Sequence, residues 1–240
     1  MKKSLLFLAV TLVFMTTACA QWGGKKVRGN GDMVTKTRSV GSYDGVQLVG
    51  SMNVELISGS EGSLEVKAES NLQEYIETEV KNGKLKISTK EGYNLQPKDD
   101  ILITVPVESI ELVSVTGSGD IWTKDKLESS NMKVQVTGSG DLMLDLEVRD
   151  LKGMVTGSGD IKLRGRSQNF DCTVTGSGDF EAYDLQAENV EARVSGSGDI
   201  MVYASKSLKA SVSGSGDIVY KGNPEKQDFK TNGSGSVSSH

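Results

Sequence analysis

The chain has 240 residues, with 27 basic and 32 acidic side chains, a formal net charge of −5 and an isoelectric point of about 5.1. Nucleic acids and anionic lipid surfaces are not expected partners of so acidic a protein, because both are polyanions. The single histidine is His240. This count excludes a Ser-His-Asp triad and a histidine-based metal site from the body of the chain.

Residues 1–20 are predicted to be a signal peptide, because two lysines precede an apolar run at 5–15 and small residues then lead to Cys19. A cysteine in this position is typical of bacterial lipoproteins, in which cleavage before Cys19 leaves it as the lipidated first residue. Ordinary cleavage before Gln21 is the alternative. Both predict export to the cell envelope, either periplasmic, anchored to the outer membrane or at the cell surface. No later segment is long and apolar enough to be predicted as a membrane span.

Residues 21–32 are predicted to be a flexible linker, and residues 33–240 a single domain, because no change in composition divides them. Alternating apolar residues predict strands at 64–68, 84–87 and 101–105, and Asn82-Gly83 predicts a hairpin turn. Residues 46–54 follow the pattern of the repeats described next and are interpreted as a degenerate coil.

The tripeptide Gly-Ser-Gly occurs seven times at intervals of 18 to 21 residues, and in six copies the next residue is Asp. A unit that repeats at this period predicts a β-solenoid, in which stacked coils share one core. The expected fold is all-β: a single-stranded parallel β-helix with about 19 residues per coil, its repeats running from 113 to 240. The copies begin at Gly117, Gly138, Gly157, Gly176, Gly196, Gly214 and Gly233.

Within the repeats, apolar residues occupy alternate positions, as in an extended chain with one buried face. Cys172 lies in an inward column and is predicted to be a core residue rather than a reactive thiol. Both motif glycines share the inward parity. They are predicted at a corner where a side chain would collide with the opposite wall or where φ is positive. These turn glycines are Gly117, Gly119, Gly138, Gly140, Gly157, Gly159, Gly176, Gly178, Gly196, Gly198, Gly214 and Gly216.

The aspartates that follow six of the Gly-Ser-Gly copies form an outward column, here called the Asp column, and are the strongest candidates for functional residues. Stacked carboxylates repel by up to about 1 kcal/mol per exposed pair. The favoured interpretation is that each accepts hydrogen bonds from its own turn. The alternatives are calcium ions between coils, the one cofactor left open, and a ladder that binds a glycan or protein. The column consists of Asp120, Asp141, Asp160, Asp179, Asp199 and Asp217.

Two other outward columns carry large side chains. Trp122 and Met143 are predicted on adjacent coils, where they form a contact for an oligomer or partner protein, or are covered by a loop. Tyr183 and Tyr203 are predicted to follow Arg164 in a stack along successive coils. This stack is either an aromatic ladder that stabilises the sheet or a platform for sugars.

Catalysis is not predicted. Glycoside hydrolysis requires two carboxyl groups in a cleft, whereas the repeated aspartates lie along one exposed edge. A phosphate-binding loop is excluded because the glycines precede β-strands rather than a helix. The remaining enzyme alternative, a polysaccharide-acting β-helix, would need a basic residue and an acidic cluster that converge in a groove.

From about residue 40 onward, the chain resembles the bacterial family of putative auto-transporter adhesin head domains, common in Bacteroidetes. The resemblance implies a right-handed β-helix similar in outline to pectin lyases, without their catalytic residues, and a role in cell adhesion. Trimeric autotransporters also have a coiled-coil stalk and a membrane-barrel anchor, whereas this chain is expected to end at its last coil, so the name supports the fold more than the function. The resemblance rests on 42–46, 64–66, 71–72, 82–87, 103–106 and the Gly-Ser-Gly-Asp series.

These observations together predict a non-catalytic protein of the cell envelope that serves as a binding, adhesion or scaffolding surface. Its expected partners are an envelope glycan or protein, and the membrane itself if Cys19 carries a lipid. Self-association into a structural assembly, or a smaller homo-oligomer, is the further alternative.

Overall fold

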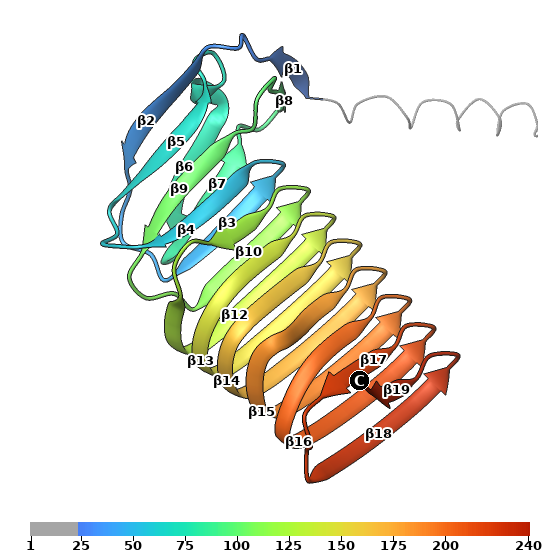
Figure 1. The fold of residues 1–240 in the computed structure, drawn as a ribbon. Coiled ribbons are helices and arrows are strands. Elements are labelled where there is room, and N and C mark those ends of the chain that lie inside the picture. Colours follow the sequence, from blue (N-terminus) through green and yellow to red (C-terminus); the bar gives the residue numbers. More distant parts are fainter. Residues whose placement is uncertain (1–23) are drawn as a thin grey trace, which may run out of the picture.

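The computed structural model describes residues 24–240, so the predicted signal peptide and Cys19 lie outside the described part of the chain. The chain winds into a parallel β-solenoid of about 7 turns with about 19 residues per coil. An N-terminal cap of mixed strands covers one end of the solenoid, and the repeats extend from it (Figure 1). The predicted fold class is confirmed.

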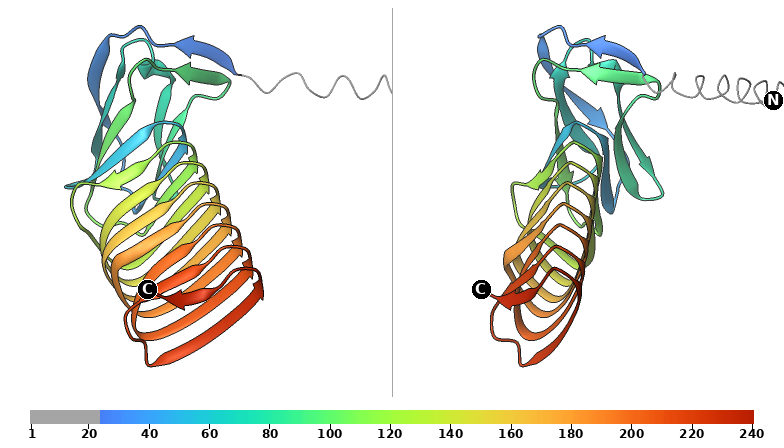
Figure 2. Two further views of the ribbon diagram at one scale, coloured as in Figure 1. Left: turned by 45° about the vertical axis from the view of Figure 1, so that its right-hand side comes forward. Right: turned by 90° about the vertical axis from the view of Figure 1, so that its right-hand side faces the viewer.

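Each central coil is formed largely by one long strand. The strand bends at the end opposite to the Gly-Ser-Gly turn and so contributes to both faces of a flattened solenoid (Figures 1 and 2). Residues before the turn form what we call the pre-turn face, and residues after it form the post-turn face. The long strands are β12 (Leu127–Gly138), β13 (Leu142–Gly157), β14 (Ile161–Gly176), β15 (Phe180–Gly196) and β16 (Ile200–Gly214).

Neighbouring coils pair in parallel with each repeat glycine opposite the next, for example Gly138 with Gly157 and Gly157 with Gly176. The flanking coils are built from shorter strands that continue the same register. These are β10 (Leu112–Gly117), β11 (Ile121–Thr123), β17 (Ile218–Lys221), β18 (Lys226–Gly233) and β19 (Val237–Ser239).

The degenerate coil is confirmed, because Val46 pairs with Val113 and Val54 with Ile121 in the parallel register of the repeats. Its strands β3 (Gly45–Gly50) and β4 (Asn53–Ser58) connect the solenoid to the cap. The cap adds antiparallel pairs and the short 3-10 helix η1 (Gln73–Tyr75). Its strands are β1 (Lys25–Arg28), β2 (Met33–Ser39), β5 (Ser63–Glu69), β6 (Ile76–Lys81), β7 (Lys84–Thr89), β8 (Tyr93–Gln96) and β9 (Leu102–Val107).

The predicted hairpin turn is present between β6 and β7, where Asn82 and Gly83 have φ values of 50° and 75°. Positive φ at both central residues is what a tight two-residue hairpin requires.

Part of the segment expected to be a linker is bound to the cap. Strand β1 pairs in parallel with β8. The fully buried Glu69 carboxylate accepts hydrogen bonds from the N–H groups of Gly31, at 2.6 Å, and Lys98, at 3.1 Å. Asn71 donates to the Arg28 carbonyl at 2.8 Å and accepts from the Asn30 N–H at 3.0 Å. Residues 25–32 are therefore held by specific contacts rather than exposed as a spacer.

The core follows the predicted inward columns. Val155, Ile161 and Phe170 are each at most 2 % exposed, and the corresponding residues of other central coils are equally buried. Cys172 is fully buried, and this burial raises the pKa of its thiol. Its predicted role as a core residue agrees with this environment.

The first motif glycine is required by the backbone. Gly157 has φ of 122°, in the left-handed region that glycine favours. Its carbonyl accepts hydrogen bonds from the N–H groups of Ser177, at 2.8 Å, and Gly178, at 3.1 Å, in the next coil. Each turn is thus attached to the following one through this oxygen.

The second motif glycine is required because there is no room for a side chain at its position. The φ of Gly159 is not positive, but a Cβ on it would overlap the backbone oxygen of Gly140 and lie 2.9 Å from Val136 Cγ1. Both obstacles belong to the preceding coil. The structure therefore corrects the expected reason for this glycine: the neighbouring turn, rather than the opposite wall, leaves no room for a side chain.

Candidate functional site

The Asp column forms a hydrogen-bonded ladder between coils. The Oδ1 atom of Asp141 accepts from the backbone N–H of Asp160 at 2.9 Å, and Oδ1 of Asp160 accepts from that of Asp179 at 2.7 Å. The same contact recurs along the column and ends at Ser236. The expected hydrogen bond from each carboxylate's own turn is therefore wrong. These aspartates link consecutive coils, which is a structural role.

Burial raises the pKa of Asp160, and the charges of Asp141 and Asp179 act in the same direction, whereas the hydrogen bond from the Asp179 N–H opposes them. Within residues 24–240, no group of three or more His, Cys, Asp or Glu side chains is placed to hold a metal ion. The calcium alternative stays a prediction.

Trp122 and Met143 meet on the post-turn face, as the sequence predicted. They are direct partners in the register of β11 and β13. Met143 is 45 % exposed, and the indole N–H of the partly buried Trp122 points to Glu55 Oε1 at 3.4 Å. Beside them lies a hollow of about 300 Å³, where the Arg164 Nε contacts Asp145 Oδ2 at 3.0 Å. Whether this small patch binds a partner stays a prediction.

The predicted stack of Arg164, Tyr183 and Tyr203 is wrong. Arg164 pairs with Asp184, and Tyr203 pairs with Gln186, because the register shifts on both sides of β15. The Gly176–Gly196 repeat is one residue longer than its predecessor. The extra residue is accommodated by two consecutive outward positions, which moves the tyrosines out of line.

Tyr183 instead reaches towards the C-terminal coils. Its ring packs edge-on against His240, with 5.5 Å between ring centroids, and the Lys221 amino group lies 4.2 Å from its centroid. Tyr183 is thus partly covered and does not form a sugar platform with Tyr203.

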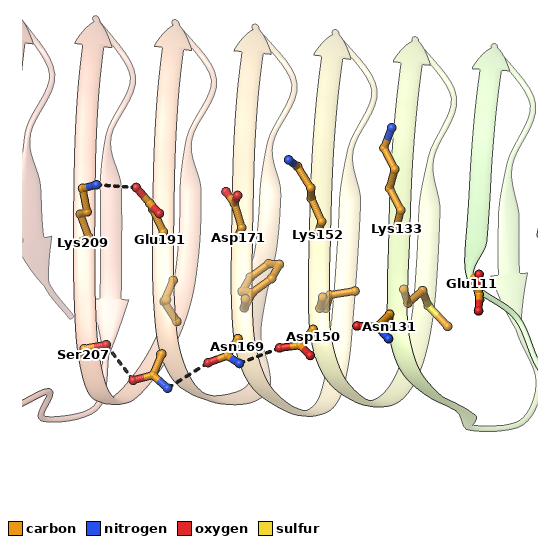
Figure 3. Close-up of a pocket in the computed structure, with 15 residues that line it drawn as sticks. Glu111, Asn131, Lys133, Asp150, Lys152, Asn169, Asp171, Glu191, Ser207 and Lys209 are labelled. Carbon is orange, nitrogen blue, oxygen red and sulfur yellow. Dashed lines mark hydrogen bonds and ion pairs between the residues drawn. The ribbon is translucent and has the colours of Figure 1, made fainter.

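Sequence reasoning missed a groove of about 640 Å³ that crosses the pre-turn face from β12 to β16 (Figure 3). Three columns of side chains line it. Its apolar column is buried, for example Leu151 at 3 % and Phe170 at 2 % exposed. What we call the polar ladder consists of Asn131, Asp150, Asn169, Asn189 and Ser207. What we call the charged column consists of Lys133, Lys152, Asp171, Glu191 and Lys209.

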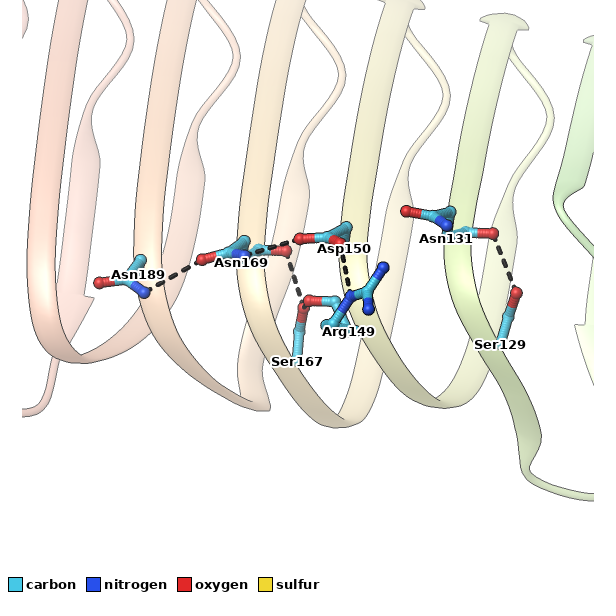
Figure 4. A network of polar contacts seen from close by, with 7 residues as sticks. All are labelled: Ser129, Asn131, Arg149, Asp150, Ser167, Asn169 and Asn189. Atoms are coloured by element: carbon cyan, nitrogen blue, oxygen red, sulfur yellow. Dashed lines mark hydrogen bonds and ion pairs between the residues drawn. The ribbon is translucent and has the colours of Figure 1, made fainter.

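Most of the polar ladder is continuous along the solenoid axis (Figure 4). The Ser207 hydroxyl donates to Asn189 Oδ1 at 2.8 Å, Asn189 Nδ2 donates to Asn169 Oδ1 at 3.0 Å, and Asn169 Nδ2 donates to Asp150 Oδ1 at 2.6 Å. Asp150 Oδ2 also accepts from Arg149 Nε at 2.8 Å. The Asn169 amide and the Arg149 guanidinium hold the pKa of Asp150 below its usual range.

The acidic residues of the charged column are paired within the protein. Asp171 contacts Arg193 at 2.7 Å, and Glu191 contacts Lys209 at 2.7 Å and Arg193 as well. The Lys209 amino group, together with Arg193, lowers the pKa of Glu191. Both acidic side chains are therefore paired with basic neighbours within the protein.

The sequence did contain a signal for this groove. Seven residues before each repeat glycine, Asn, Asp or Ser recurs in five coils, in a column that the repeat alignment displays. The hollow shape of the groove, however, depends on where the long strands bend, and the interior of β14 has a positive-φ glycine, Gly165, whereas the interior of β13 has none.

Comparison with known proteins supports the fold. Residues 42–224 match the family described as "putative auto-transporter adhesin, head GIN domain". The chain belongs to this family. No curated protein matches it.

Three solved structures are similar to the chain over nearly its whole length. A putative adhesin from Bacteroides fragilis has 25 % sequence identity and a TM-score of 0.84, covering 89 % of this chain and 100 % of its own. A protein from Parabacteroides distasonis described as putative lipid binding has 29 % identity, a TM-score of 0.74 and coverage of 90 % and 100 %. A putative adhesin from Parabacteroides merdae has 20 % identity, a TM-score of 0.72 and coverage of 90 % and 99 %, and its likeness concerns the fold alone.

Across residues 24–240, no helix combines the length and hydrophobicity needed to cross a bilayer.

Proposed function

We propose that this protein is a non-catalytic binding protein of the cell envelope and that its pre-turn groove binds an extended glycan. The observation that carries this proposal is the polar ladder, which presents one amide, carboxylate or hydroxyl per coil along the groove. Coils repeat at about 4.8 Å, a length similar to that of one sugar in an extended chain. A linear glycan along the axis would therefore meet equivalent groups repeatedly.

The ladder keeps hydrogen-bonding capacity for such a ligand. A side-chain amide offers two N–H donors and two acceptor lone pairs. Asn169 uses one donor towards Asp150 and one acceptor towards Asn189. One donor and one acceptor lone pair remain on this exposed amide, and sugar hydroxyls can pair with both. The ladder bonds also fix the orientation of the amides before binding, which reduces the entropy lost on binding.

The family description and the name of the Bacteroides fragilis relative support adhesion. The name of the Parabacteroides distasonis relative raises lipid binding as the second candidate. An acyl chain needs exposed apolar surface, whereas the apolar column of this groove is at most about 3 % exposed at Leu151 and Phe170. The groove therefore fits a polar ligand better.

The test is titration of the protein with soluble linear polysaccharides, both neutral and acidic, followed by calorimetry. Asn169→Ala combined with Asn189→Ala should weaken binding at least about tenfold, equivalent to about 1.4 kcal/mol. Asn223→Ala, in the exposed loop between β17 and β18, is the matched control and should leave affinity unchanged. Absence of binding to every polysaccharide, or equal affinities of the two variants, would contradict the proposal.

Two alternatives have their own measurements. A polysaccharide-acting enzyme would release products from the same polysaccharides, with or without calcium, and the proposal expects none. A self-associating structural element would show light scattering that rises with protein concentration, whereas the proposal requires no assembly.

We also propose that the protein is anchored through Cys19. In the producing bacterium, Cys19→Ser or globomycin treatment should abolish acylation and leave soluble protein or uncleaved precursor. Mass spectrometry of the mature N-terminus is the measurement. An unmodified N-terminus at Gln21 in the untreated wild type would establish ordinary secretion instead.

A further inference from the structure

Two residues of the charged column, Lys133 and Lys152, differ from its other members, which form ion pairs within the protein. Lys133 and Lys152 are exposed and are direct partners in the register of β12 and β13. Within the described residues 24–240, no acidic oxygen lies within 4.0 Å of either amino group. Like charges directly opposite one another on a sheet are destabilising. The two lysines therefore repel one another, and neither forms an ion pair in this part of the chain, although Asp171 is the register partner of Lys152 on the other side.

Two of the nearby acids are engaged elsewhere, whereas the exposed Glu111, which also lines this end of the groove, lies more than 4.0 Å from both lysine amino groups. Asp150 binds Arg149 and Asn169, and Asp171 binds Arg193, as described above. In Figure 3, the lysine side chains extend along their strands, with their amino groups directed away from Asn131 and Asp150 on the same coils. The groove therefore has a polar ladder along its length and, at the end near β12 and β13, two lysines without an ion pair among the described residues and one exposed acid, Glu111.

We infer that this end of the groove binds the carboxylates of a polyuronate, a linear acidic polysaccharide with one carboxylate per sugar. This inference rests on the glycan-binding function proposed above and names the class of glycan. Each lysine is a compact, mobile point charge with three donors. One lysine per coil, at about the spacing of one sugar, matches one single negative charge per sugar. The polar ladder supplies hydrogen bonds to the hydroxyls of the same sugars.

The overall negative charge of the protein does not conflict with this inference. At physiological ionic strength, exposed charges more than about 8 Å apart are largely screened, so the potential at this end is set by Lys133, Lys152 and Glu111, whose summed charge is positive. Because both lysines are exposed, binding should weaken as salt concentration rises. Long-range attraction should contribute little.

The experiment titrates the full mature chain with polygalacturonate, with dextran sulfate, and with neutral pullulan. The wild type should bind polygalacturonate most tightly. Lys133→Gln and Lys152→Gln should each weaken that binding about fivefold, as expected for the loss of one ion pair of about 1 kcal/mol. Lys152→Arg should retain it, and raised salt should reduce the difference between wild type and the Gln variants.

The matched control is Lys162→Gln, which removes the same charge from the post-turn face, where Lys162 pairs with Glu181 at 2.8 Å. It should leave affinity unchanged. Thermal melting gives an independent measurement: Lys152→Gln should leave the melting temperature unchanged or slightly raised at low salt, because it relieves repulsion. A clear fall would show that the lysine stabilises the fold and would overturn the inference.

The outcomes separate the inference from the function on which it rests. Binding of pullulan that depends on Asn169 but not on the lysines would keep glycan binding and overturn polyuronate recognition. Tighter binding of dextran sulfate than of polygalacturonate would overturn carboxylate recognition and would indicate recognition of sulfate groups instead. No binding of any of the three polymers would overturn both.

Discussion

Gly159→Val should lower the free energy of unfolding by about 3 kcal/mol, the largest effect we expect from a single substitution. The new Cβ would overlap the Gly140 backbone oxygen and crowd Val136, and backbone of a hydrogen-bonded coil cannot move aside as the end of a flexible side chain can. For a protein of this size, such a change corresponds to a fall in melting temperature of about 6 to 12 °C. Thermal unfolding followed by circular dichroism is the measurement.

Ser158→Ala is the control for this substitution. Ser158 is the exposed neighbour of Gly159, and its backbone N–H, which donates to the Gly138 carbonyl at 2.8 Å, is unchanged by the substitution. Its melting temperature should equal that of the wild type. If Gly159→Val also melted at the wild-type temperature, the second glycine would not face the neighbouring coil, and the stacking described here would be incorrect.

The parallel coils could be predicted from the sequence because they depend on which residues occupy alternate positions and therefore lie on the same face of an extended chain. Val155, Gly157, Gly159 and Ile161 occupy alternate positions, and one face of an extended chain must be buried. The same parity identified residues 46–54 as a coil, even though Met52 and Asn53 replace the glycine and the aspartate of the motif.

Contacts between coils could not be predicted in the same way. The partner of the Asp160 carboxylate lies 19 residues away, and it is set by how one turn stacks on the next rather than by the local sequence. The binding of residues 25–32 to the cap has a similar origin, since Glu69 reaches Gly31 only in the folded cap.

The candidate surfaces were predicted less well because they depend on local register. The partnership of Trp122 with Met143 was correct, since the aligned coils keep a uniform register there. The tyrosine stack was wrong because the register shifts by one residue between β14 and β15, after Glu181, and by three residues between β15 and β16, after Ala182. Repeat lengths show that a residue is inserted but not where the bulge forms.

The Asp ladder should tolerate loss of charge but not loss of its acceptor. Asp160→Asn keeps an oxygen that can accept from the Asp179 N–H, whereas Asp160→Ala leaves that partly buried donor without this partner. The alanine variant should therefore lose about 1 to 3 kcal/mol of stability. The asparagine variant should be as stable as the wild type, or slightly more stable, at neutral pH and low salt, and Asp179→Asn should behave in the same way.

The expected direction of the stability change in Asp160→Asn follows from the pKa of Asp160, which the fold raises by burial and by the neighbouring carboxylates. An acid whose folded pKa exceeds its unfolded value destabilises the fold when ionised, and this contribution develops as pH rises from the unfolded to the folded pKa. The advantage of Asp160→Asn should therefore be present at neutral pH and should disappear below the unfolded pKa. Added sodium chloride should reduce it as well, because salt screens the repulsion from Asp141 and Asp179.

Calcium bound between coils would produce the opposite result. Millimolar calcium would then raise the melting temperature of the wild type well beyond the effect of sodium chloride at equal ionic strength, and Asp160→Asn would lose that increase. We expect equal effects of the two salts, because the Oδ1 atoms of the ladder already accept backbone hydrogen bonds. A calcium-specific increase that the asparagine variants lack would establish the Asp column as a metal site rather than a link between coils.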